Sequence, residues 1–202
     1  MSQSVRHPHS DVVIDESIRM PEVDFPSTSA NMVISEVVGN YEHFLEDEEK
    51  VRQQYPWATR FVMGYPLPSW QRALTWSDEQ KARFITSIWS GVDIGSYLIN
   101  DQYDTLLVEG AKTFQYRKFS NIILDGQQRL QAIQDYLNDL FAVPDAQGTP
   151  RRWSDLPRRE RRRFESRHFA RCSVKCWDEA TLRHIYNLRA FGGTAHEAHE
   201  MA

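Results

Sequence analysis

The segment 121–130 constrains the fold most strongly, because an apolar, β-favouring run ends at Asp125-Gly126 and a helical pattern follows at once. Apolar residues then recur at steps of three and four and so share one helix face; they are Leu130, Ile133, Leu137, Leu140 and Phe141. The pattern predicts a strand, a tight turn and an amphipathic helix. Asp125 is the expected N-cap, since its carboxylate can accept hydrogen bonds from amides of the first turn.

The start of this predicted helix has the chemistry of an anion site. Unpaired backbone amides and the positive end of the helix dipole attract phosphate, and Gly126 allows a ligand to approach the backbone closely. Gln127, Gln128 and Arg129 lie on the first turn. Arg129 can bind phosphate in a bidentate way, and the glutamines can donate to phosphate oxygens or position a water. Because Asp-Gly is also a common turn, a purely structural role is the alternative.

A second Gln-Arg pair, Gln71-Arg72, follows the prolines at 66 and 68. This pair can close over the same pocket and add a second guanidinium to it. In the alternative, Arg72 forms an ion pair with Asp125 and only pins two elements together. The residue chemistry leaves both interpretations open.

The remaining pattern is a mixture of short helices and strands. We expect a helix capped by Ser29 or Asn31, with an apolar stripe that includes Leu45, and a second helix in which Ser77 and Gln80 form a capping box and Gly91 the C-cap. Further segments are helices at 153–167 and from 178 to the glycines at 192 and 193, strands at 60–65, 96–99 and 169–177, a strand candidate at 105–108, and a loop at 144–150.

The chain of 202 residues fits one domain. We expect an N-terminal arm at 1–28, a single domain at 29–195 and a C-terminal tail at 196–202. The net charge of −4 hides an asymmetry, because residues 11–50 are strongly acidic and residues 151–171 are rich in arginine. Such an asymmetry indicates an interaction surface rather than a fold.

The arginine-rich segment is a candidate nucleic-acid contact through Arg158, Arg159, Arg162 and Arg163. Guanidinium groups on one helix can neutralise backbone phosphates. Consecutive arginines also point around a helix and can pair with nearby glutamates, so an ordinary solvated surface is the alternative.

Several classes of site are excluded or disfavoured. The Walker P-loop and the G-x-G dinucleotide fingerprint are both missing. Cys172 and Cys176 lack a second ligand pair, so we expect small buried residues rather than zinc ligands, and we assign no metal site. The sequence shows no secretory or membrane-spanning segment, and we expect a cytoplasmic protein without membrane contact.

The motif Asp125-Gly126-Gln127-Gln128-Arg129 resembles the D-G-Q-Q-R motif of the GmrSD-type restriction enzyme N-terminal domain. Further similar segments follow the family's order and cover about residues 60–200; they are 68–72 with Trp76, 87–95, 153–157 and 187–194. The resemblance implies an α+β fold of the ParB/sulfiredoxin-like type. Such a fold has a small mixed sheet packed with helices, here with an additional N-terminal helix.

The resemblance also implies a function. In similar proteins this motif belongs to a nucleotide-handling pocket associated with NTP hydrolysis, so we expect an NTP of unknown base, with Mg²⁺ as a candidate companion. Asp125 would orient Arg129, bind a metal or position water. The implied catalytic residues are Asp125, Gln128 and Arg129, and the implied nucleotide-binding residues are Gly126, Gln127, Gln71 and Arg72.

The expected setting is DNA restriction or phage defence. A nuclease domain often follows such domains, whereas here the sequence stops soon after residue 194. We therefore expect a stand-alone module, a truncated homologue, or a component that works with a separate nuclease or defence protein as partner. One alternative is a non-enzymatic DNA-binding adaptor that uses the arginine-rich helix. Another is a ParB-like nuclease, for which we can assemble no set of metal-binding carboxylates.

Overall fold

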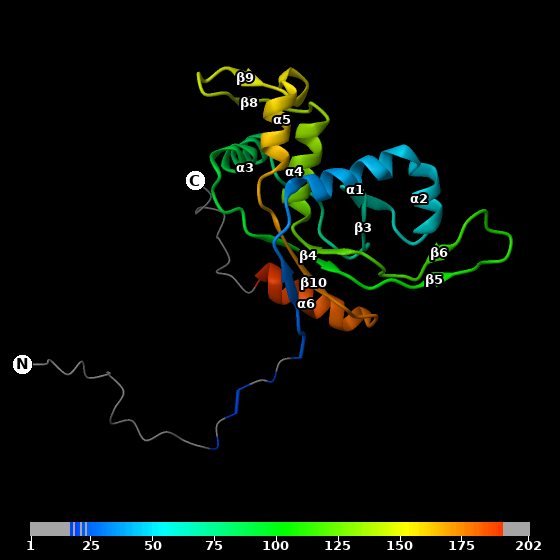
Figure 1. The fold of residues 1–202 in the computed structure, drawn as a ribbon. Helices are drawn as coiled ribbons and strands as arrows, with labels where there is room; N and C mark the ends of the chain where they lie inside the picture. Colours follow the sequence, from blue (N-terminus) through cyan, green and yellow to red (C-terminus); the bar gives the residue numbers. More distant parts are fainter. Residues whose placement is uncertain (1–16, 18, 21, 23, 192–202) are drawn as a thin grey trace, which may run out of the picture.

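The computed structural model describes residues 17, 19, 20, 22 and 24–191 and has an α+β fold (Figure 1). This confirms the predicted fold class, while the ParB/sulfiredoxin-like assignment stays a prediction. The elements are β1 Thr28–Ala30, α1 Ile34–Glu46, α2 Glu48–Gln54, β2 Arg60–Val62, β3 Tyr65–Leu67, α3 Asp78–Ser90, β4 Ser96–Asn100, β5 Thr105–Leu106, β6 Gln115–Tyr116, β7 Ile123–Asp125, α4 Gln127–Leu137, β8 Val143–Pro144, β9 Pro150–Arg151, the 3-10 helix η1 Trp153–Asp155, α5 Arg158–Glu165, β10 Ala170–Val174 and α6 Glu179–Phe191.

The central sheet has four strands in the order β1-β10-β4-β7. Strands β10 and β4 are parallel, with Cys172 opposite Leu98, whereas β1 and β7 pair antiparallel with their neighbours. The sheet is therefore mixed. Its edge strand β7 leads directly into α4, which places the turn between them at the edge of the sheet.

Side chains of β4 alternate between two hydrophobic clusters, as expected for a strand covered on both faces. Tyr97 and Ile99 belong to the larger cluster, which includes residues of α1, α3, α4 and α5. Leu98 belongs to the smaller cluster, together with Leu182 and Ile185 of α6. Figure 1 shows this arrangement, with α6 lying across the sheet from α1 and α4. The sheet thus joins two layers of helices.

The N-terminal helix differs from the prediction. Ser29 lies in β1 opposite Cys172, and α1 begins at Ile34 after Val33, whose side chain makes no capping bond. Ser29 therefore does not cap the helix, because the backbone of residues 28–30 pairs with β10 and forms the edge strand of the sheet. Leu45 was expected in the apolar stripe but is 53% exposed.

The helix at 77–91 was predicted well. Ser77 and Gln80 form the expected capping box, and Gly91 ends the helix in the left-handed conformation. Leu140 was wrongly placed on the buried face of α4: the helix ends at Leu137, and Leu140 is 63% exposed. The apolar repeat continues past the end of the helix, so periodicity alone did not mark the boundary.

Two segments form hairpins that the sequence pattern did not predict. The predicted strand at 60–65 belongs to the β2–β3 hairpin, in which Pro66 of β3 lies opposite Phe61 of β2. Proline is tolerated there because β3 belongs to a two-stranded ribbon with a free edge. The expected loop at 144–150 is the β8–β9 hairpin, whose turn Asp145 stabilises by accepting from the amides of Gln147 and Thr149.

The segment 153–167, expected as one helix, is divided into η1 and α5 with Pro157 as the N-cap of α5. No helix within the described part of the chain is long and apolar enough to cross a membrane. Most of the arm at 1–28, the glycines at 192 and 193 and the tail at 196–202 lie outside the described residues, so the predicted domain boundaries stay predictions.

Candidate functional site

The turn between β7 and α4 is formed by Gly126, which has φ 94° and is the N-cap of α4. A Cβ atom at this position would lie 2.6 Å from Cβ of Tyr97, so both the dihedral angle and the space require glycine. Asp125 was predicted as the N-cap, and this is wrong. The N-cap Gly126 makes no side-chain capping bond to the first turn of α4, whose amides therefore require another acceptor.

The Asp125 carboxylate binds two arginines instead of capping the helix. Its Oδ2 accepts from Nη2 of Arg129 at 3.1 Å and from Nε of Arg189 at 3.1 Å. Arg189, in α6, also donates to the backbone carbonyl and the hydroxyl of Ser96 in β4. Both arginines use the same carboxylate oxygen, so Oδ1 accepts no hydrogen bond from the described residues.

Arg129 is held in a defined orientation on α4. Its Nη1 donates to the carbonyl of Ile94 at 3.1 Å, and its guanidinium lies 5.9 Å from the ring centroid of Phe169. Burial lowers the pKa of Arg129, and Arg189 acts in the same direction, while Asp125 opposes both. An arginine nevertheless stays charged in proteins. The site therefore contains a fixed positive charge that is partly removed from water.

The three glutamines of the predicted site are buried and bind the segment that precedes α3. Gln128 accepts from the amides of Thr75 and Trp76 at 3.1 and 3.3 Å and donates to the carbonyl of Ala73 at 3.2 Å. Its amide group is thus occupied by the backbone, which indicates a positioning role.

Gln71 and Gln127 fix the same segment to the strand and the helix. Gln71 donates to the carbonyl of Ile123 in β7, and Gln127 donates to the carbonyl of Arg72 at 3.2 Å. The Oε1 atoms of both glutamines are buried and have no hydrogen-bond partner among the described residues. The two Gln-Arg pairs are therefore joined, with the glutamines as the connection.

A cavity of about 210 Å³ opens at this junction. It is lined by Arg72, Trp76, Leu124, Asp125, Gly126, Gln127, Gln128, Arg129 and Tyr186. Arg72 is exposed, and its guanidinium makes no hydrogen bond or ion pair with any described residue. The alternative in which Arg72 only pairs with Asp125 is thus not the arrangement observed. Arg72 and Arg129 both line the cavity into which the first turn of α4 opens.

This arrangement suits an anion with several oxygens. Two guanidinium groups and uncapped helix amides line the same small space, and each can donate charge-assisted hydrogen bonds to phosphate. The negative charge of Asp125 is compensated by Arg129 and Arg189. Within the described residues, no group of three or more His, Cys, Asp or Glu side chains is placed to hold a metal ion.

The four arginines predicted to contact nucleic acid lie on α5. Arg158, Arg159 and Arg162 are exposed and make no hydrogen bond or ion pair with the described residues. Arg163 donates to Glu160 at 2.8 Å, so its charge is partly compensated. Arg161, one of their neighbours in α5, instead donates to the carbonyls of Ser154 and Leu156 and has a structural role.

Sequence reasoning missed Arg189 and Tyr186 of α6 as parts of the site. Arg189 is 64 residues from Asp125, and no spacing rule connects a helix on one face of the sheet with a turn at its edge. The segment 187–194 had been recognised as a similarity to the family, which was the available signal, but no role followed from it. Cys172 and Cys176 are half-buried free thiols beside the smaller cluster.

Comparisons with known proteins give one match. A family model described as GmrSD restriction endonuclease, N-terminal domain, matches residues 48–190, which is well over half of the chain. No curated protein and no solved structure matched. The matched region begins at α2 and reaches the last turn of α6, so it includes every residue that lines the cavity at the start of α4.

Proposed function

The chain belongs to the GmrSD restriction endonuclease N-terminal domain family, and from this premise we propose that it binds a nucleoside triphosphate with the phosphates at the start of α4. The family connects the chain with DNA restriction and phage defence. The observation that supports nucleotide binding is the opening of the uncapped first turn of α4 into a cavity lined by Arg72 and Arg129. Helix amides together with arginines are a recurrent way to hold phosphate.

The aromatic residues of the cavity extend the proposal to the rest of the nucleotide. Trp76 and Tyr186 line the same cavity as the two arginines. A cavity of about 210 Å³ accommodates phosphate groups better than a whole nucleotide, so the base would lie at these aromatic side chains near the opening. The chemistry of the lining does not select one base.

Hydrolysis is the second part of the proposal, and Asp125 is the residue assigned to it. Its Oδ1 atom is left without a described partner, so it can accept a hydrogen bond from water or contact the Mg²⁺ that accompanies the nucleotide. When bound, Mg²⁺ would neutralise charge on the phosphates. Arg129 would bind the phosphate, and Gln128 would keep the 73–76 segment in place instead of acting on the nucleotide.

Calorimetric titration with ATP, GTP, CTP and UTP, each with Mg²⁺, tests binding, and phosphate release is measured on the same samples. Arg72→Ala is the informative variant, because its guanidinium supports no described contact and its loss should not disturb the fold. We expect it to weaken binding about tenfold or more, the effect of one charge-assisted hydrogen bond. The matched control is Lys112→Ala, which removes an exposed cation from the loop between β5 and β6.

Two results would refute the nucleotide proposal. One is that none of the four nucleotides binds to the wild-type protein. The other is that Arg72→Ala and Lys112→Ala bind a nucleotide as tightly as the wild type does, which would place the ligand elsewhere. Binding without phosphate release would retain the first part of the proposal and remove the second.

A second candidate function is contact with a nucleic-acid backbone through α5. It is favoured by the exposed guanidinium groups of Arg158, Arg159 and Arg162, which make no hydrogen bond or ion pair with the described residues. Of these three, Arg162 lies near Glu165 and acts to lower the pKa of that carboxyl. Each phosphate neutralised on duplex DNA should contribute a slope of about −0.9 to the dependence of log affinity on log salt. Replacing Arg158 and Arg162 by alanine should therefore reduce that slope by about two. An unchanged slope would show that α5 is an ordinary solvated surface.

A further inference from the structure

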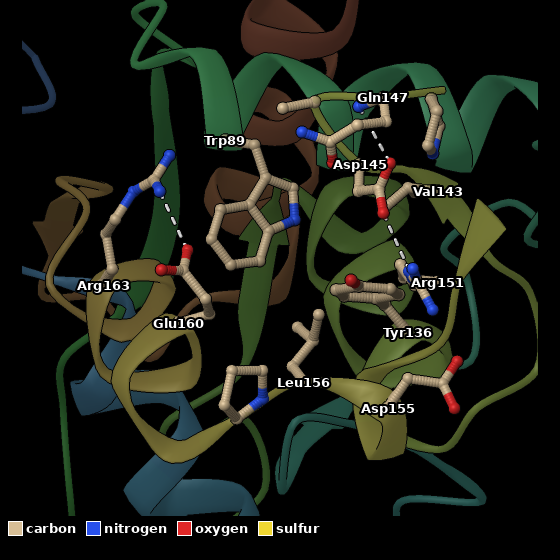
Figure 2. A pocket seen from close by; sticks show the side chains of 13 residues that line it. Trp89, Tyr136, Val143, Asp145, Gln147, Arg151, Asp155, Leu156, Glu160 and Arg163 are labelled. Carbon is tan, nitrogen blue, oxygen red and sulfur yellow. Dashed lines mark hydrogen bonds and ion pairs between the residues drawn. The ribbon is translucent and has the colours of Figure 1, made fainter. Parts of the chain in front are cut away.

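A second cavity, of about 490 Å³, lies between α3, α5, η1 and the β8–β9 hairpin (Figure 2). It shares no lining residue with the cavity at the start of α4. Its volume falls within the range of about 300–1,000 Å³ that is typical of small-molecule sites. Neither the phosphate chemistry of the first cavity nor the exposed arginines of α5 accounts for this space.

Aromatic and aliphatic side chains form the walls of this second cavity. Trp89 lies in the middle of the lining, between Tyr136 and the Glu160–Arg163 pair, with Leu156 below it (Figure 2). Both aromatic rings are supported from behind by Phe164, at centroid distances of 5.1 Å from Trp89 and 5.8 Å from Tyr136. The Arg163 guanidinium also lies 5.4 Å from the ring centroid of Trp89, so the orientation of the indole is fixed. A flat ring can stack on the part of the indole that lines the cavity, beside this guanidinium.

Four charged residues of the lining form two ion pairs, and Asp155 accepts from the backbone amide of Arg152. Arg151 donates to Asp145 at 2.9 Å, and Arg163 donates to Glu160 at 2.8 Å, as the dashed lines in Figure 2 show. An anion inside the cavity would have to break one of these pairs, so the space favours an uncharged guest. The carboxylates retain acceptor capacity for N–H groups at the edge of such a guest.

Tyr136 forms the floor of the cavity. Its side chain is fully buried, and burial raises the pKa of its hydroxyl while a hydrogen bond with the Trp89 side chain acts in the opposite direction. Tyr136 and Trp89 therefore support one another, and the hydroxyl is not accessible from the cavity. A flat guest with apolar faces would suit this aromatic lining.

An exposed cation lies on the same side of α5 as the lining residue Arg163. Arg159 precedes Arg163 by four residues on α5 and therefore shares its side of the helix. Arg163 lines the cavity, whereas Arg159 is exposed and makes no hydrogen bond or ion pair with the described residues. A phosphate attached to the guest could thus be held outside the cavity while the ring remains inside.

We propose that this cavity binds a nucleobase, stacked on Trp89, with the attached phosphate held by Arg159. The inference goes beyond nucleotide binding at α4, and it rests on the second candidate function because it requires α5 to hold a phosphate. The base would be carried either by a nucleic-acid strand, from which it is turned out of the stack, or by a free nucleotide. The recognition chemistry is the same for both sources.

Fluorescence anisotropy with a labelled single-stranded DNA, and with a strand of equal length whose residues are abasic, separates the base from the backbone. The wild-type protein should bind the base-bearing strand about tenfold more tightly, the effect of one stacked base. Ala146→Trp places an indole in the opening from the exposed β8–β9 turn and should abolish this preference. Trp89→Leu should do the same, and Arg159→Ala should weaken both strands equally.

The controls locate the effect within the molecule. Lys112→Ala, in the loop between β5 and β6, should retain the preference for the base-bearing strand. Nucleoside monophosphates are added as competitors to wild-type protein and to Ala146→Trp. If the monophosphates displace DNA from wild-type protein but have no such effect on Ala146→Trp, the cavity is supported as a nucleobase site. The base would then come from a free nucleotide.

The inference is overturned if wild-type protein binds both strands equally and nucleoside monophosphates displace neither. It is also overturned if the preference persists in both Ala146→Trp and Trp89→Leu. Equal binding of the two strands that still depends on Arg159 would leave the backbone contact of α5 standing and remove the base site alone. Failure to bind either strand or any monophosphate would remove both.

Discussion

The Asp125 carboxylate and the Arg189 guanidinium lie 3.1 Å apart, although 64 residues separate them in the sequence. Asp125 ends the edge strand β7, and Arg189 lies in α6 on one face of the sheet. The contact therefore ties the last part of α6 to the turn that opens into the candidate phosphate cavity.

Arg189→Ala should loosen the end of α6 without unfolding the domain. The pair is partly exposed, so its loss should cost about 1 kcal/mol or less in the free energy of unfolding. Hydrogen exchange should accelerate for amides in the last turn of α6, because the contacts to Asp125 and Ser96 are lost together. Arg183→Ala, which removes an ion pair within α6 itself, is the control. Equal exchange in both variants would show that Arg189 does not anchor the helix.

Asp125→Asn should separate binding from hydrolysis. The substitution removes the negative charge that engages Arg129 and Arg189 and leaves both guanidinium groups more available to phosphate. We expect tighter binding of a nucleoside triphosphate, measured by calorimetry, and loss of phosphate release. Weaker binding would indicate that Asp125 organises the cavity, and unchanged release would remove it from the proposed hydrolysis.

Gln128→Leu tests the assignment of this residue to positioning. The substitution leaves the amides of Thr75 and Trp76 without their acceptor. We expect a loss of about 1–3 kcal/mol in the free energy of unfolding by urea denaturation, the usual effect of unpairing buried groups. Gln128→Glu retains the acceptor and should recover part of this loss. Full stability of Gln128→Leu, with hydrolysis abolished, would instead assign Gln128 to the chemistry.

Glu165→Gln should make stability less dependent on pH. Burial raises the pKa of Glu165, and the nearby carboxylate of Glu42 raises it further. The folded state therefore binds a proton more readily than the unfolded state, so stability falls as the pH rises from the ordinary value of 4.5 through the raised pKa. The variant should be more stable than wild type at neutral pH, and this difference should disappear at pH below 4.5.

Urea denaturation at several pH values measures this difference. Glu109→Gln, in the exposed loop between β5 and β6, controls for the change in net charge alone. A difference between Glu165→Gln and wild type that does not vary with pH would show that packing, rather than ionisation, separates them.

Local sequence signals were sufficient to predict the structure where both residues of an interaction lie in one short segment. Ser77 and Gln80 are three residues apart and form their capping box without help from the rest of the chain. The left-handed Gly91 and the strand–turn–helix at 121–130 were predictable for the same reason. The D-G-Q-Q-R segment likewise located the candidate site, because its glycine, glutamines and arginine are neighbours on one helix turn.

The predictions failed where a distant segment competes for the same groups. Asp125 was a reasonable N-cap on local grounds, yet two arginines attract its carboxylate away from the amides of α4. Ser29 was a reasonable cap as well, but pairing with β10 draws its backbone into the sheet. In both cases the competing partner lies many residues away, so the local pattern contains no trace of it.

The sequence by itself determined the α+β class, the turn at Asp125-Gly126 and the candidate phosphate-binding residues of the D-G-Q-Q-R segment, because these depend on periodicity and on the chemistry of neighbouring side chains. Only the tertiary structure decided that Arg189 neutralises Asp125, that Gln128 is occupied by the backbone, and that Trp89 and Tyr136 line a common cavity. These contacts join segments from different elements. Their geometry is fixed by how the helices pack on the sheet, which no spacing along the chain specifies.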